Sequence, residues 1–182
     1  MLGRLHTQPS QKYVKIGTLI AIGFFMVFYI LMRVVSADID SSYDVFDLEF
    51  AWTTEKIDKI LTDWGQDSVD KMILATWIDF GFLLAYGTSL AGLSLLVARR
   101  YNEEEKARNI GYTSVVGSYL ASGFDALENV NLLIILYPFP NSYPDFAPLL
   151  ASISAVVKFT LVILTIIYII IGFLFQLFRK NE

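Results

Sequence analysis

Four ionisable side chains lie inside long apolar stretches of this 182-residue sequence: Asp79, Asp125, Glu128 and Lys158. An ionisable group in such a stretch is costly to bury and usually faces a polar interior or another charge. Carboxyls that differ in protonation state can exchange protons with a substrate, and an ammonium can orient an oxygen atom. These residues therefore predict acid–base chemistry, proton movement or the binding of a polar group in apolar surroundings.

The composition excludes most other catalytic chemistry. The chain has no cysteine, and its single histidine, His6, lies in the N-terminal tail. Zinc–cysteine sites, haem ligation and Ser-His-Asp catalysis therefore lack their residues. There is no nucleophile motif, no phosphate-binding loop and no basic patch for nucleic acid. We expect a binding protein rather than an enzyme, with no cofactor and no nucleic-acid partner. The enzymatic alternative is acid–base chemistry on an apolar substrate.

The apolar excess of the chain indicates which elements position these residues. Hydrophobic residues make up 55% of the sequence and charged residues only 18%, which is more apolar than a typical soluble domain. Four stretches have the length of roughly 20 residues that a transmembrane helix needs. They are residues 16–35, 72–98, 110–137 and 147–178. We predict an all-α fold, an integral membrane four-helix up-down bundle that forms a single domain over residues 1–182.

The distribution of charged residues predicts an orientation. Nine of the fourteen Lys and Arg residues lie in the two terminal tails and in the loop between the second and third spans. The loop of residues 36–71 instead carries ten acidic residues and three lysines. Because basic segments stay in the cytoplasm, both termini are predicted to be cytoplasmic and the acidic loop extracytoplasmic. We expect a prokaryotic cytoplasmic membrane, with the first span kept as an anchor rather than removed as a signal peptide.

This topology predicts that the four buried ionisable residues lie at a similar depth. With a helical rise of 1.5 Å per residue, Asp79 and Glu128 lie about 12 and 13 Å from the outer ends of their spans. By the same measure, Lys158 and Asp125 lie about 17 and 18 Å deep. Three carboxyls beside one ammonium cannot all ionise cheaply at low dielectric. At least one carboxyl is therefore expected to be protonated at neutral pH.

Polar residues on the same helices extend the predicted layer. Ser122 and Asn129 share a helical stripe with Asp125, because three or four residues separate neighbours in the stripe. Tyr86 follows Asp79 by two turns, and Ser154 precedes Lys158 by one turn. The expected ligand-binding or proton-relay residues are Asp79, Asp125, Glu128, Asn129, Lys158, Tyr86, Ser122 and Ser154.

The acidic loop contains one predicted helix, at residues 54–64. Ile57, Ile60, Leu61 and Trp64 recur at helical spacing and form one apolar face, while Gly65 can end the helix. An amphipathic helix between two spans can lie on the membrane surface or cap the end of the bundle. We expect a structural interfacial helix, with a gating lid as the alternative.

The same loop has a weak likeness to a calcium-binding loop. Asp38, Asp40, Asp44 and Glu49 occupy the first, third, seventh and twelfth positions of such a loop. Tyr43 occupies the sixth position, where the sharp turn needs glycine. Acid-rich loops produce this spacing by chance, so we predict no metal site here.

Three functions fit the predicted cluster. We favour an outward-facing pocket that binds, and in its catalytic form processes, a lipid or apolar small molecule, because the inner half of the spans has few polar residues. The alternatives are proton or cation translocation and an accessory or assembly subunit in which the charges lock helices together. The expected partners are membrane lipid, an apolar small-molecule ligand, and a second copy or another membrane protein.

Three parts of the sequence resemble a pattern in small bacterial four-span membrane proteins that form no named family. These parts are Leu48-Glu49-Phe50-Ala51 with Trp64-Gly65, Asp79-Phe80 with Tyr86-Gly87, and Asp125-Ala126-Leu127-Glu128-Asn129. The resemblance implies a four-span bundle and carries no particular activity. In architecture alone, a bundle with buried carboxyls is also similar to sterol-isomerase-like membrane proteins.

Overall fold

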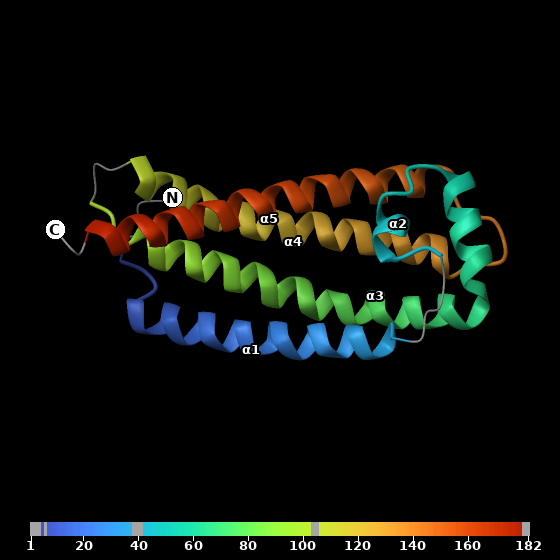
Figure 1. Cartoon of the computed structure of the whole chain (residues 1–182), viewed down its shortest axis with the longest axis horizontal. Helices are drawn as coiled ribbons and strands as arrows, with labels where there is room; N and C mark the ends of the chain where they lie inside the picture. The colour runs from blue at the N-terminus through green and yellow to red at the C-terminus, as the bar shows by residue number, and fades with distance from the viewer. Residues whose placement is uncertain (1–4, 6, 38–41, 103–105, 180–182) are drawn as a thin grey trace. The chain divides into compact units, whose positions relative to one another are not determined.

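The computed structural model describes residues 5, 7–37, 42–102 and 106–179. These residues form helices and connections, without a strand among them. The helices are α1 (Gln11–Val35), α2 (Val45–Glu49), α3 (Thr54–Ala98), α4 (Lys106–Leu136) and α5 (Phe146–Arg179) (Figure 1). The predicted all-helical bundle is confirmed, since four long apolar helices pack together.

Helices α1, α3, α4 and α5 are each long and apolar enough to cross a membrane. In α1 and α5 only 11% of the most apolar window is buried within the protein, against 50% in α3 and 56% in α4. Apolar surface left this exposed in a single chain is expected where lipid, not water, surrounds the helices. Length and composition therefore indicate a membrane protein.

Helix α3 joins the predicted interfacial helix to the second predicted span. The two meet at Gly65, whose φ of 69° and ψ of 172° are not helical. This region of backbone space is open essentially only to glycine, so the chain bends there. Residues 66–71, which we expected to belong to the loop, are helical. The side chain of Gln66 donates to Asp70 Oδ1 at 2.8 Å, a pairing across one helical turn that suits a polar helix.

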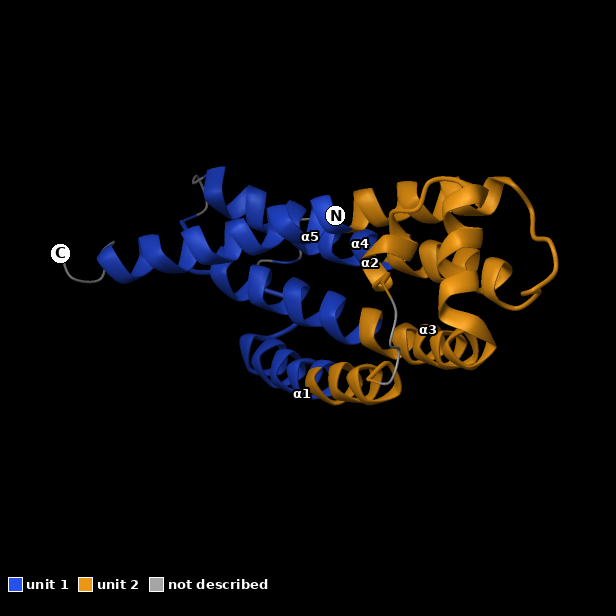
Figure 2. Cartoon of the chain, turned by 45° about the vertical axis from the view of Figure 1, so that its right-hand side comes forward, with its two compact units in different colours: residues 1–25, 84–122, 159–182 blue, residues 26–83, 123–158 orange. Residues whose placement is uncertain are grey.

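The chain divides into two compact units, and each long helix contributes to both (Figure 2). Unit 1 consists of residues 1–25, 84–122 and 159–182. Its described core contains Val14, Ala91, Leu95, Ala98, Tyr112 and Val115. Close helix contact within unit 1 depends on small residues, because a Cβ atom at Gly92 would collide with Thr18 and one at Gly87 with Ser122.

Unit 2 consists of residues 26–83 and 123–158. Its core is larger and gathers around the predicted helix of residues 54–64. The apolar face of this helix is confirmed: Ile57, Ile60 and Leu61 are fully buried and Trp64 nearly so. This face packs in one cluster with Leu132 and Leu136 of α4 and with Ala147 and Ala151 of α5. The helix thus covers the ends of α4 and α5 within unit 2.

Candidate functional site

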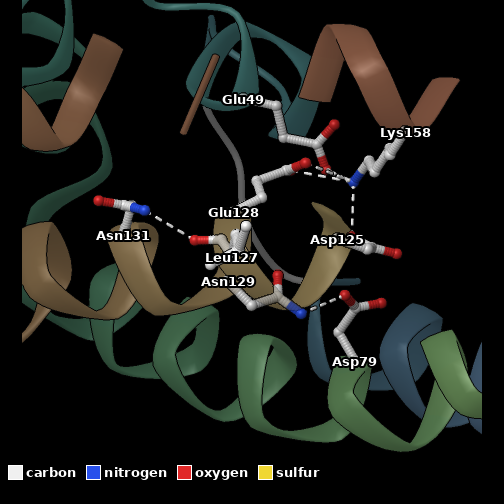
Figure 3. A network of polar contacts seen from close by, with 8 residues as sticks. All are labelled: Glu49, Asp79, Asp125, Leu127, Glu128, Asn129, Asn131 and Lys158. Carbon is white, nitrogen blue, oxygen red and sulfur yellow. Dashed lines mark hydrogen bonds and ion pairs between the residues drawn. The ribbon is translucent and has the colours of Figure 1, made fainter. Parts of the chain in front are cut away.

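Lys158 lies at the centre of a buried ionic cluster in unit 2 (Figure 3). Its Nζ atom is 2.9 Å from Asp125 Oδ1 and 2.9 Å from Glu128 Oε2, and it also approaches Glu49 Oε1 at 3.5 Å. The exposed fractions of the four side chains are 9% for Lys158, 4% for Asp125, 0% for Glu128 and 13% for Glu49. One ammonium is therefore shared by three carboxyls away from solvent.

Helix α4 supplies two of these carboxyls because of its periodicity. Asp125 and Glu128 are three residues apart and lie on adjacent turns, so both reach Lys158 on α5. Asn129 follows directly and lies closer to α3, where its Nδ2 atom donates to Asp79 Oδ2 at 2.6 Å (Figure 3). A single turn of α4 thus makes polar contacts with both of its neighbours within unit 2.

Glu49 is the member of the cluster that sequence reasoning did not identify. The sequence indicates for Glu49 only a calcium-like spacing and a place in the resemblance segment, whereas the structure directs its side chain toward Lys158 (Figure 3). It ends the short helix α2, which begins with a capping box between Asp44 and Asp47. The signal that could have found it is local: Glu49 stands in the segment Leu48-Glu49-Phe50-Ala51, an apolar setting within a polar loop.

Three contacts outside the cluster hold α2 in place. Leu48 is fully buried in the core of unit 2. Before α2, the Trp64 indole donates to the carbonyl oxygen of Tyr43 at 3.1 Å. After α2, the backbone N–H of Trp52 donates to Ser152 Oγ on α5 at 3.0 Å. Trp52 has a φ of 61°, which is rare for a bulky residue, and the bond to Ser152 helps to hold this strained turn.

The remaining predicted site residues fall in different places. Ser154 is buried on α5 in unit 2, one turn from Lys158. Ser122 and Tyr86 are buried in unit 1, where Ser122 Oγ donates to the carbonyl oxygen of Ser118 at 3.3 Å. The structure therefore gathers Asp79, Asp125, Glu128, Asn129 and Lys158, adds Glu49, and assigns Ser122 and Tyr86 to the other unit.

Two of the four residues with calcium-loop spacing, Asp38 and Asp40, lie outside the described residues. Asp44 accepts the backbone N–H of Asp47 at 2.9 Å as the cap of α2, and Glu49 faces Lys158. Among the described residues, no group of three or more histidine, cysteine, aspartate or glutamate side chains has an arrangement that could hold a metal ion.

The balance of charge in the cluster is unequal. Glu49, Asp79, Asp125 and Glu128 would carry four negative charges if ionised, against one positive charge on Lys158. Burial raises the pKa of Glu49, and the attraction of the Lys158 ammonium, which lowers it, does not cancel this effect. The charge on Asp125 raises the pKa of Glu49 further. Such a cluster is stable only if protons or an additional cation neutralise the surplus carboxylates.

An apolar groove of about 510 Å³ lies elsewhere in unit 2. It is lined by Trp77, Phe80, Val130, Leu133, Ile134 and Tyr137, and the Trp77 indole donates to Tyr137 Oη at 2.8 Å. None of its lining residues belongs to the ionic cluster.

No protein family, curated protein or solved structure significantly matches this chain. The resemblance to small bacterial four-span proteins therefore stays a prediction.

Proposed function

We propose that the chain is an integral membrane protein whose buried cluster in unit 2 binds the cationic end of an apolar molecule, such as an amine-bearing lipid or small molecule. The observation that carries this proposal is the convergence of three largely buried carboxyls on one ammonium, with a fourth carboxyl, Asp79, bonded to Asn129 on the same turn of α4. A cation with an apolar body would match the surplus negative charge and remain compatible with a bilayer.

The charges outside the cluster support a membrane orientation with the acidic loop outside and both termini in the cytoplasm. By sequence, unit 1 has nine basic and four acidic residues. Unit 2, without the residues of the cluster, has ten acidic and four basic residues. This segregation agrees with the preference of basic segments for the cytoplasmic side. In this orientation, the loop that carries Glu49 is extracytoplasmic.

The cluster exceeds what a structural lock between helices requires. A bond from Lys158 to Asp125 or Glu128 would be enough to join α5 to α4. Glu49 adds a third carboxyl at the cost of burying another charge, and its side chain faces both Lys158 and Glu128. Surplus buried acids of this kind are more typical of a site that binds protons or cations than of a stabilising ion pair.

The polar residues of unit 1 favour binding over translocation. Several serine hydroxyl groups there bond to their own helices: Ser89 donates to the Ala85 carbonyl at 2.7 Å, and Ser118 donates to the Ser114 carbonyl at 2.8 Å. Proton and ion pathways in membranes usually contain acidic or histidine side chains, and the helical segments of unit 1 have none. A catalytic version of the proposal, acid–base chemistry on an apolar substrate, would use the same carboxyls.

Three probes of equal chain length test this proposal: dodecylamine, dodecanol and dodecanoic acid. The full chain is incubated with each probe at neutral pH, and native mass spectrometry measures which probe stays bound. We expect the wild type to retain dodecylamine preferentially and the Asp125→Asn/Glu128→Gln variant to lose that preference. Glu55→Gln is the matched control, because Glu55 is an exposed carboxylate paired with Lys59.

Equal retention of the three probes by the wild type would overturn the proposal. So would an undiminished preference for dodecylamine in the double variant. Circular dichroism of each variant establishes that the helices are intact before retention is compared.

A further inference from the structure

Helix α2 contacts the ionic cluster of unit 2 through its last residue, Glu49. Among the described residues, Glu49 is the member of the cluster that does not come from a long helix. Its 3.5 Å approach to Lys158 is longer than the 2.9 Å approaches of Asp125 and Glu128. The weakest ionic contact in the cluster is thus the one that attaches a five-residue helix.

The segment around α2 has other attachments in unit 2. Ala51 is buried in the core, and before α2 the Tyr43 carbonyl accepts from the Trp64 indole at 3.1 Å. Leu48 inserts into the core, and the Trp52 N–H bonds to Ser152 Oγ at the end of the segment. On its exposed side, Asp47 of α2 pairs with Lys56 at 3.6 Å, with both side chains more than a third exposed. Exposed pairs of this kind contribute little to stability. The strained φ of 61° at Trp52 also favours release of this turn when the bond to Ser152 breaks.

Charges from two helices face Glu49. Lys158 approaches it from α5, and Asp125 and Glu128 approach from α4. Asp79 of α3 is a fourth, more distant influence. Because two closer carboxyls already share Lys158, an ionised Glu49 gains less attraction than it loses by desolvation and repulsion. A proton on the Glu49–Glu128 carboxyl pair would remove this penalty while α2 stays in place.

We infer that residues 45–53 form a lid over the cluster, closed by a proton on the Glu49–Glu128 pair and released when that proton leaves. This inference rests on the proposed function only in its purpose, because an open lid would expose the proposed cation-binding site. The movement of residues 45–53 itself needs no ligand. The closed lid binds a proton that the open lid gives up, so low pH favours closure and rising pH favours opening.

Loss of the proton would have two effects, and both would favour the binding of a cation. Loss of the proton would release the lid and at the same time leave the carboxylates charged. A cationic ligand would then meet an open and negatively charged site. At low pH, protons would occupy the place of the ligand and the lid would remain shut.

Cysteine labelling of the full chain in lipid nanodiscs tests the lid. The natural sequence has no cysteine, so a single Leu48→Cys substitution places one thiol in the core beneath α2. Phe46→Cys supplies the reference, because Phe46 lies on the same helix and is 57% exposed. Dividing the maleimide reaction rate of the first variant by that of the second removes the ordinary effect of pH on thiol reactivity.

We expect this ratio to rise with pH by up to about tenfold per pH unit, the limit for release of one proton. Adding Glu49→Gln should keep the ratio low at every pH, because glutamine is neutral and needs no proton. Adding Asp47→Asn should leave the dependence on pH intact, because it removes a charge from the exposed side of the same helix.

A ratio that does not change with pH would overturn the lid. So would a higher ratio after Glu49→Gln is added than with the cysteine substitutions alone. Amide hydrogen exchange of residues 45–53 in the unsubstituted chain, corrected for the intrinsic rate at each pH, provides a check that does not disturb Leu48. It should show the same rise with pH. Neither measurement uses a ligand, so failure of the lid and failure of dodecylamine binding are separate results.

Discussion

Asn129 on α4 donates a 2.6 Å hydrogen bond to Asp79 on α3, across fifty residues of sequence. Both side chains are buried. The amide of asparagine can donate to an ionised carboxylate and accept from a protonated one, so it serves Asp79 in either state. Asp79 is therefore connected to the Lys158 cluster through Asn129, which lies on the same turn of α4 as Asp125 and Glu128.

This relationship predicts that Asn129→Ala destabilises the protein by about 1 to 3 kcal/mol, the cost of leaving a buried polar group without its partner. Asn131→Ala is the control two residues away on the same helix. The Asn131 side chain donates to the Leu127 carbonyl of its own helix at 2.7 Å, so its removal should cost less than about 1 kcal/mol. Reversible unfolding in detergent measures both variants. Equal losses would contradict a special role for the Asp79 bond.

Removal of the central cation should have a larger effect that depends on pH. Lys158→Met leaves the surrounding carboxyls without their ammonium, and breaking a buried pair in this way typically costs about 3 to 5 kcal/mol. The loss should shrink at acidic pH, because protonated carboxyls no longer repel each other. Melting temperatures at acidic and neutral pH check this. A loss that is equal at both would contradict it.

Lys59→Met is the matched control for this variant. Lys59 pairs with Glu55 at 2.7 Å on the exposed surface of the helix of residues 54–64. Exposed pairs one helical turn apart contribute only about 0.3 to 0.5 kcal/mol, so the control should unfold almost like the wild type.

The architecture could be predicted because it depends on simple properties of the sequence. Long apolar segments specify the four long helices, and the spacing of Ile57, Ile60 and Leu61 specifies the apolar face of the interfacial helix. The positions of Asp79, Asp125, Glu128 and Lys158 along their helices likewise predict a similar depth for these four residues. This prediction needed only the helical rise and the direction of each span.

The contribution of Glu49 could not be predicted in the same way. A residue in a connecting segment has no depth set by a helix, and its partner depends on the path of the whole segment. Here the path is set by the burial of Leu48 and the bond between Trp52 and Ser152. The helical conformation of residues 66–71 escaped prediction for another reason. Polar residues occur equally well in a loop and on an exposed helix, so their pattern does not decide between the two.

The bend at Gly65 leads to a prediction about backbone conformation. A Cβ atom at Gly65 would meet no atom within 4 Å, but its φ is +69°. Gly65→Ala should therefore destabilise the protein by about 1 to 3 kcal/mol through backbone strain alone. Gly23→Ala in α1 is the control, because it also has no neighbour within 4 Å and lies inside a regular helix. Alanine there should be neutral or slightly stabilising.

Thermal unfolding of the two variants distinguishes the effect of backbone strain from the effect of adding a methyl group. Destabilisation of Gly65→Ala with an unaffected Gly23→Ala would support the bend as a required feature of α3. If both substitutions were harmless, the helix would tolerate a straight path at residue 65, and the interfacial helix would not depend on glycine for its direction.

Glu49 should also make the global stability of the protein depend on pH. Its pKa in the folded protein is raised above the ordinary value of 4.5, mainly by burial, so the folded state binds the proton more tightly than the unfolded state. The associated stability is fully present below the ordinary pKa and is lost as pH rises through the raised pKa. As pH rises above the ordinary glutamate pKa, the wild type should therefore lose stability relative to Glu49→Gln.

Glu55→Gln provides a control, because the pKa of Glu55 is shifted in the opposite direction to that of Glu49. Hydrogen bonding to Lys59 lowers the pKa of this exposed carboxyl, so its smaller effect should appear only at acidic pH, where Glu55 becomes protonated. Chemical unfolding at a series of pH values compares the three proteins. Parallel curves for the wild type and Glu49→Gln above the ordinary glutamate pKa would mean that Glu49 exchanges no proton on unfolding. In that case, an ionised Glu49 would be fully stabilised by Lys158, and the cluster would have no surplus charge for a cation to neutralise at this position.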